Sequence, residues 1–105
     1  PPAVVLARSL HAVGNLPDGT DLVCIAPTES ELQGDTEHGI SPRTELLLEH
    51  AGWELRRRTL RDGLRLKQPL WASRNFTVGA PLKLHAWALT EYERVLFIDA
   101  DSIVL

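Results

Sequence analysis

Residues 94–105, RVLFIDADSIVL, place two acidic side chains directly after an apolar run. The four apolar residues at 95–98 predict a strand buried on both faces, and Asp99 and Asp101 follow at its carboxyl end. Residues two apart on an extended chain project to the same side, so both carboxylates are expected to converge on one point. Two carboxylates in one place repel each other unless a cation lies between them.

A divalent cation is the first expectation for this pair of acids. Carboxylate oxygens suit Mn²⁺ or Mg²⁺, whereas Zn²⁺ would require His or Cys nearby. Ala100 is small, which lets a ligand approach the backbone between the two acids. The competing interpretation is a solvated turn, the commoner structure for Asp-x-Asp in an arbitrary sequence. The apolar runs on both sides favour the metal, because unpaired carboxylates between buried strands would be costly.

Helices and strands alternate along the chain before this run. Ser41 and Pro42 supply the N-cap and first position of one helix, which ends at Gly52, and Gly14 ends an earlier helix. The expected elements are helices over residues 1–13, 42–51 and 81–92 and strands over residues 21–27 and 53–60. Apolar strands that alternate with helices predict an α/β fold, with a mostly parallel sheet and flanking helices.

The helix over residues 81–92 carries a second group of candidate site residues. Its expected buried face contains Leu84, Trp87 and Ala88. Lys83 lies near its start, where unpaired backbone N–H groups favour phosphate, and Arg74 precedes it in a segment without a sustained period. Lys83 could neutralise a diphosphate, although a solvent-facing lysine is the ordinary alternative.

The composition limits the classes of partner. The 105 residues are 44% apolar with a net charge of −3, so no basic field draws in nucleic acid. No apolar stretch reaches the roughly 18 residues of a membrane span. Cys24, the single cysteine, lies in an apolar run and is expected to behave as a small hydrophobe. The chain has no methionine and opens on Pro1, which indicates a piece of a longer protein.

Other conspicuous residues are given structural interpretations. The four histidines show no ligand spacing and are assigned no role. The tryptophans Trp53, Trp71 and Trp87 are expected in the core. A solvated face is expected for the basic run Arg56, Arg57, Arg58, Arg61, Arg65 and Lys67.

Residues 81–105, PLKLHAWALTEYERVLFIDADSIVL, resemble glycosyltransferase family 8, and most closely its glycogenin branch. The shared pattern is a Lys-Leu pair, a helix ending in Leu-Thr-x-Tyr, a short apolar strand, and Asp-Ala-Asp before an apolar tail. Residues 1–10 and 21–27 are similar to the first helix and second strand of these enzymes. The resemblance implies an incomplete GT-A fold, a Rossmann-like nucleotide-diphosphosugar transferase domain. Such enzymes move a hexose, usually glucose from UDP-glucose, with retention.

The resemblance also implies roles for individual residues. Asp99 and Asp101 match the manganese ligands of the family, with Mg²⁺ as the other candidate ion. Asp99 and Ala100 would also line the pocket for uridine and ribose. Lys83 matches the lysine that contacts the sugar nucleotide, and Arg74 lies at the matching distance before it.

By the same resemblance, residues 1–105 form the N-terminal, nucleotide-sugar-binding half of a single glycosyltransferase domain. The first strand of the family would precede Pro1, and the histidine that completes the metal site and the acceptor side would follow Leu105. This piece alone is therefore expected to be inactive, and its catalytic residues are unknown. Its partners would be a UDP-sugar donor and a protein or carbohydrate acceptor, with a homodimer as a further candidate. The compartment would be the cytoplasm for a glycogenin-like protein, or the Golgi for other members.

Two alternatives stay open. A haloacid-dehalogenase-type phosphatase also places Asp-x-Asp after an apolar strand, but Ser102 and Ile103 fit its motif poorly. A non-catalytic relative would keep the fold as a module that binds the sugar nucleotide. Retention of both aspartates argues against such a relative, because a decayed site tends to lose costly buried charge first.

Overall fold

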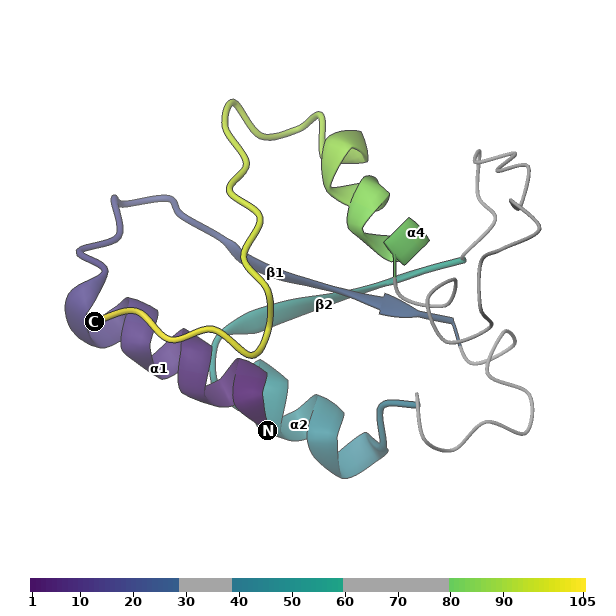
Figure 1. The fold of residues 1–105 in the computed structure, drawn as a ribbon, viewed down its shortest axis with the longest axis horizontal. Coiled ribbons are helices and arrows are strands. Elements are labelled where there is room, and N and C mark those ends of the chain that lie inside the picture. Colours follow the sequence, from purple (N-terminus) through teal and green to yellow (C-terminus); the bar gives the residue numbers. More distant parts are fainter. Residues whose placement is uncertain (29–38, 60–79) are drawn as a thin grey trace. The chain divides into compact units, whose positions relative to one another are not determined.

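The computed structural model describes residues 1–28, 39–59 and 80–105 (Figure 1). Its strands, β1 and β2, pair in a two-stranded parallel sheet. The elements are α1 (Pro2–Val13), β1 (Leu22–Pro27), α2 (Pro42–His50), β2 (Trp53–Arg58), α4 (Ala80–Lys83) and the 3-10 helix η2 (Leu84–Ala88). Parallel strands need a long crossover connection, and α2 lies within it. The predicted α/β class, with a parallel sheet and flanking helices, is confirmed.

The chain divides into two compact units. The first contains Pro1–Cys24, Ile40–Arg56 and Leu96–Leu105, so it holds α1, α2 and the C-terminal segment. The second contains Ile25–Gly39 and Arg57–Val95, so it holds the carboxyl ends of both strands together with α4 and η2. No helix in the described part of the chain has the length and apolar character needed to cross a bilayer.

Helix α1 forms as predicted, but it buries a narrower face than its apolar residues suggest. Proline at its start lacks only an N–H that would have no helical partner, and Gly14 N donates to Leu10 O at 2.9 Å at its end. The buried residues are Leu6, Ala7 and Leu10. Val5 is 51% exposed, so the apolar stripe is wider than the surface that covers it.

Helix α2 begins at the N-cap that the sequence predicts. The Oγ of Ser41 accepts a hydrogen bond from Thr44 N at 3.2 Å, which satisfies one of the unpaired donors of the first turn. Leu48 is the buried residue of this helix, and α2 contacts α1 within the first unit. Leu46 and Leu47 are exposed.

The turn after α2 requires glycine. Gly52 has φ +96°, a conformation that L side chains rarely adopt, and a Cβ there would lie 3.2 Å from Nε2 of His11. Directly after it, the indole Nε1 of Trp53 donates to Ala3 O at 2.9 Å. The start of β2 is thereby fastened to the start of α1, and Trp53 is half-buried.

The strands are less deeply buried than predicted. In β1 only Ala26 is fully buried, and the other residues are half-buried. Cys24 is a free, half-buried thiol, and burial raises its pKa. The ladder continues past the end of β1, because Thr28 N donates to Arg58 O at 3.2 Å.

The third predicted helix differs from expectation in length and in its buried face. It consists of α4 followed by η2, and no helix continues to residue 92. A 3-10 helix has three residues per turn instead of 3.6, so a face predicted from α-helical spacing is displaced. His85, Ala86 and Leu89 are buried, whereas Trp87 is 77% exposed. The expectation of a core position for Trp87 is therefore wrong.

The predicted strand at residues 95–98 is absent. Residues 94–99 have no regular secondary structure, and pairing among the described residues joins β1 to β2 alone. A strand is defined by hydrogen bonds to a neighbouring strand, so apolar sequence by itself cannot make one. Val95, Leu96 and Phe97 are exposed in consequence.

Candidate functional site

The two aspartates lie in a turn of the first unit. The carbonyl of Asp99 accepts a hydrogen bond from Ser102 N at 3.0 Å, which closes a turn with Ala100 and Asp101 at its centre. This i to i+3 bond is the hallmark of a β-turn. The prediction that the acids follow one another on an extended chain is therefore wrong.

Both acidic side chains are exposed, so a desolvation penalty does not distinguish a metal site from a solvated turn here. Two carboxylates on one short turn nevertheless supply the hard oxygen donors that Mn²⁺ and Mg²⁺ take. Within residues 1–28, 39–59 and 80–105 no group of three or more His, Cys, Asp or Glu side chains could enclose an ion. Asp99 and Asp101 thus stay predicted ligands, and further ligands would have to come from elsewhere.

The segment after the turn is attached to helix α1. Val104 N donates to Ser9 Oγ at 3.0 Å, and the Ser9 hydroxyl donates in turn to Leu6 O at 2.8 Å. A serine on the apolar side of α1 therefore serves as a relay between the helix and the C-terminal segment. This pair of bonds anchors the residues that follow the acidic turn within the first unit.

Lys83, the other candidate site residue that the structure describes, belongs to the second unit, whereas the acidic turn belongs to the first. Lys83 is exposed, ends α4 and serves as the N-cap of η2 in the second unit. Helix α4 is four residues long, so the expected contribution of a helix N-terminus to phosphate binding is small. Arg74 lies outside the described residues, as do Trp71, Arg61, Arg65 and Lys67.

The structure gives His85, which was assigned no role from the sequence, a specific contact. Its side chain is 7% exposed, and Nε2 lies 2.9 Å from the carbonyl oxygen of Thr59. A carbonyl can only accept, so Nε2 carries the proton in this bond. The apolar neighbours of His85 in the sequence gave a hint of burial, but nothing in the sequence indicated its partner.

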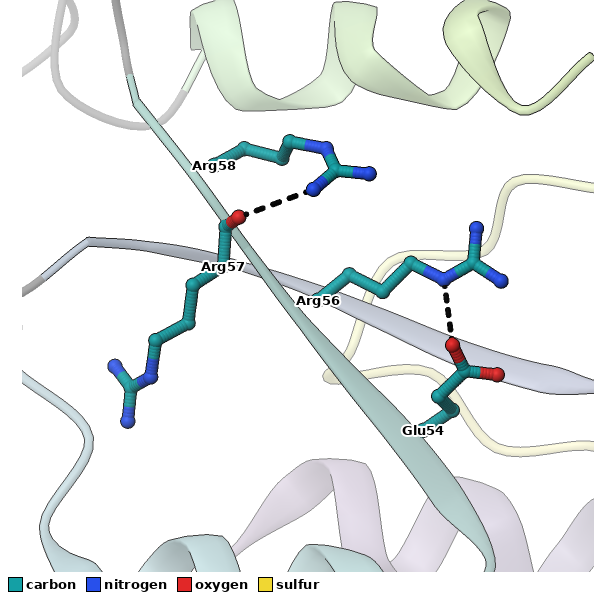
Figure 2. Close-up of polar contacts among 4 residues, drawn as sticks. All are labelled: Glu54, Arg56, Arg57 and Arg58. Carbon is teal, nitrogen blue, oxygen red and sulfur yellow. Dashed lines mark hydrogen bonds and ion pairs between the residues drawn. The ribbon is translucent and has the colours of Figure 1, made fainter.

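The arginines of β2 are less solvated than predicted. Figure 2 shows that Arg57 leaves the strand on the side opposite to Arg56 and Arg58, as strand alternation requires. Arg56 Nε donates to Glu54 Oε1 at 2.7 Å, and the Arg56 side chain is only 18% exposed (Figure 2). A guanidinium nitrogen of Arg58 lies 3.3 Å from the carbonyl oxygen of Arg57. Arg57 Nη1 donates instead to Pro27 O of β1, at 3.5 Å. The expected solvated face is therefore wrong for these three residues, which contact the strands of the sheet.

Curated plant proteins show similarity to the chain. It is 30% identical to the putative UDP-glucuronate:xylan alpha-glucuronosyltransferase 5 of Arabidopsis thaliana over 103 residues, which are 98% of this chain and 15% of that protein. It is 42% identical over 55 residues, 52% of this chain and 8% of the relative, to UDP-glucuronate:xylan alpha-glucuronosyltransferase 2 of the same plant. A third relative, the putative enzyme 4, is 35% identical over 69 residues, 66% of this chain and 12% of the relative.

These similarities support a glycosyltransferase family in general. None of the three relatives is named as a glycogenin, so the similarity does not extend to that branch specifically. The chain spans between 8% and 15% of the length of these relatives. No family model matches the chain, and no solved structure matches it significantly.

Proposed function

We propose that residues 1–105 form the nucleotide-sugar-binding half of a GT-A glycosyltransferase domain. The complete protein would transfer a sugar from a UDP-sugar to a protein or carbohydrate acceptor, with retention at the anomeric carbon. The observation that carries this proposal is the similarity to a protein named as a glucuronosyltransferase, because it extends over 98% of the chain. The parallel α/β fold is compatible with it.

The family resemblance and the plant relatives suggest two different sugar donors. The resemblance to glycosyltransferase family 8 suggests UDP-glucose, whereas the names of the plant relatives specify UDP-glucuronate. The two sugars differ by a carboxylate in place of a hydroxymethyl group. A protein that prefers UDP-glucuronate needs a cation for that carboxylate, so a direct comparison of the two donors decides between them.

Asp99 and Asp101 are the proposed holders of Mn²⁺, with Mg²⁺ as the second candidate, and Ala100 between them would let the nucleotide approach the backbone. The ion, when bound, would stabilise charge on the departing diphosphate. Lys83 and Arg74 are the proposed cationic contacts to the same diphosphate. Each of these side chains acts on the leaving group, and the residues that receive the acceptor lie elsewhere in the proposed protein.

The test uses the full-length protein and measures release of UDP from UDP-glucose and from UDP-glucuronate with Mn²⁺. Asp101→Asn keeps the size of the side chain and removes its charge, so it should reduce metal-dependent release at least about a hundredfold. Glu93→Gln is the matched control, because Glu93 is also an exposed acid close in sequence to the turn. Retained release in Asp101→Asn would contradict the assignment of the metal site.

Calorimetry with UDP and Mn²⁺ measures binding, and together with the UDP-release assay it distinguishes a non-catalytic binding protein from an active transferase. A protein that binds both but releases no UDP from either donor would be a sugar-nucleotide-binding relative. A phosphatase would instead hydrolyse a phosphate monoester and ignore both UDP-sugars. No described residue favours that third activity, and none of the three relatives is named for it.

A further inference from the structure

His85 is the one polar residue that is buried as a whole in the described part of the chain, and it lies two residues after Lys83. Burying an imidazole is costly unless its nitrogens find partners. The bond from Nε2 to the carbonyl of Thr59, at 2.9 Å, provides one such partner. The position of the Thr59 carbonyl, at the end of β2, decides what this bond holds in place.

Thr59 directly follows the last residue of β2. The carbonyl of Arg58 accepts a hydrogen bond from Thr28 N at 3.2 Å, and the next carbonyl, that of Thr59, accepts from His85. Two successive carbonyls at the end of β2 are thus tied to β1 and to η2, respectively. All of these residues belong to the second unit, so the bond fastens η2 to the carboxyl end of the strand within that unit.

Lys83 is joined rigidly to this anchor. Its backbone is helical, with φ −59° and ψ −31°, and α4 runs into η2 without an intervening loop. Ala86 and Leu89, which follow the anchor in the sequence, are also buried. Fixing His85 therefore fixes the start of η2, where the exposed Lys83 lies. Ligands of parallel α/β sheets bind beyond the carboxyl ends of the strands.

We propose that His85 is a positioning residue, which holds Lys83 at the carboxyl end of β2 so that its ammonium group can meet the diphosphate of a nucleotide sugar. This inference rests on the proposed function, since it gives Lys83 a diphosphate to bind. His85 itself does not touch the ligand. Its effect on nucleotide affinity passes entirely through Lys83.

A double-mutant cycle on the full-length protein tests this, with the affinity for UDP in the presence of Mn²⁺ measured by calorimetry. His85→Leu removes the donor at similar volume, and it should weaken UDP binding about tenfold. His85→Gln carries an amide N–H near the position of Nε2, and it should stay within about twofold of the unmodified protein. Lys83→Met should weaken binding by itself, and adding His85→Leu to it should weaken binding no further.

A leucine at position 85 can also disturb folding, so His85→Asn provides a second test. Its amide is too short to reach the Thr59 carbonyl, and circular dichroism melting checks that the variant is folded. It should lose as much affinity as His85→Leu. Additive losses in the double variant, equal losses in the Gln and Asn variants, or unchanged affinity in the Leu or Asn variant would each overturn the role of His85. Failure of the unmodified protein to bind UDP would instead overturn the proposed function.

Discussion

The backbone N–H of Val104 donates a hydrogen bond to the side-chain oxygen of Ser9 at 3.0 Å, and so joins positions 95 residues apart in the sequence. It is accompanied by the bond from the Ser9 hydroxyl to Leu6 O. One hydroxyl therefore contacts both the middle of α1 and the segment that follows the acidic turn. Contacts of this kind are absent from any local pattern, because their two ends lie far apart in the chain.

Replacing Ser9 by alanine should destabilise the protein. The Val104 N–H would lose its acceptor, and a part-buried bond of this type contributes about 1 kcal/mol. Ser9→Ala should lower the free energy of unfolding by that amount in urea titrations, with an unchanged m-value. Ser9→Thr keeps the hydroxyl and is the matched control. Equal stability of the alanine variant and the unmodified protein would show that the bond contributes nothing.

Gly52→Ala should destabilise the protein more than Gly19→Ala does. Both glycines have positive φ, +96° and +82°, so alanine is strained at either position by about 1–2 kcal/mol. A Cβ at position 52 would also lie 3.2 Å from Nε2 of His11, whereas nothing lies within 4 Å at position 19. The melting temperatures of the two variants should therefore differ, and the difference measures the cost of the contact between the new Cβ at position 52 and His11.

The histidine contact can be isolated further. In the background of Gly52→Ala, His11→Ala removes the atom that the new Cβ would meet. The melting temperature should rise toward that of Gly19→Ala. A double variant no more stable than Gly52→Ala would mean that strain alone explains the loss at position 52.

Cys24 should make stability depend on pH in the alkaline range. Burial raises the pKa of its thiol above the ordinary value of 9.0, so the unfolded chain releases this proton first as the pH rises. The stabilisation is therefore complete below pH 9.0 and is lost as the pH rises through the raised pKa. Unfolding free energies of the unmodified protein and Cys24→Ala, compared between about pH 7 and pH 11, should show this difference.

The alanine variant is its own control in this comparison, because the two proteins share every other residue. The difference in unfolding free energy should be constant up to pH 9.0 and shrink above it. The range ends at about pH 11, roughly two units above the ordinary thiol pKa. A difference in unfolding free energy that stayed constant over that range would contradict a raised pKa.

Local signals in the sequence predicted the helices and strands of the first half of the chain. Ser41 before Pro42 identified an N-cap because a serine oxygen at that position has a backbone donor within reach. Gly52 identified a helix end because the chain must reverse there with positive φ. Both signals act over a few residues, so they are readable without knowing what packs against them.

Features that depend on distant neighbours were not predicted. Residues 95–98 are apolar and β-prone, but a strand needs a hydrogen-bonded neighbour, and the sequence does not say whether one is present. Trp87 was assigned to the core from α-helical spacing, and the 3-10 geometry of η2 turned it outward. For the candidate site, the motif predicts Asp99 and Asp101 as ligands and leaves a turn open as the alternative, whereas the anchor of His85 appears only in three dimensions.

The exposed apolar run at residues 95–97 bears on self-association of the protein. Leu96 is 83% exposed and is flanked by β-prone apolar residues, a composition that promotes intermolecular strand association. Arg94 precedes the run and Asp99 ends it, so charges bracket it as gatekeepers against self-association. The acidic pair thus has a second effect that needs no ligand, because its negative charge is one of the two barriers against association of separate molecules.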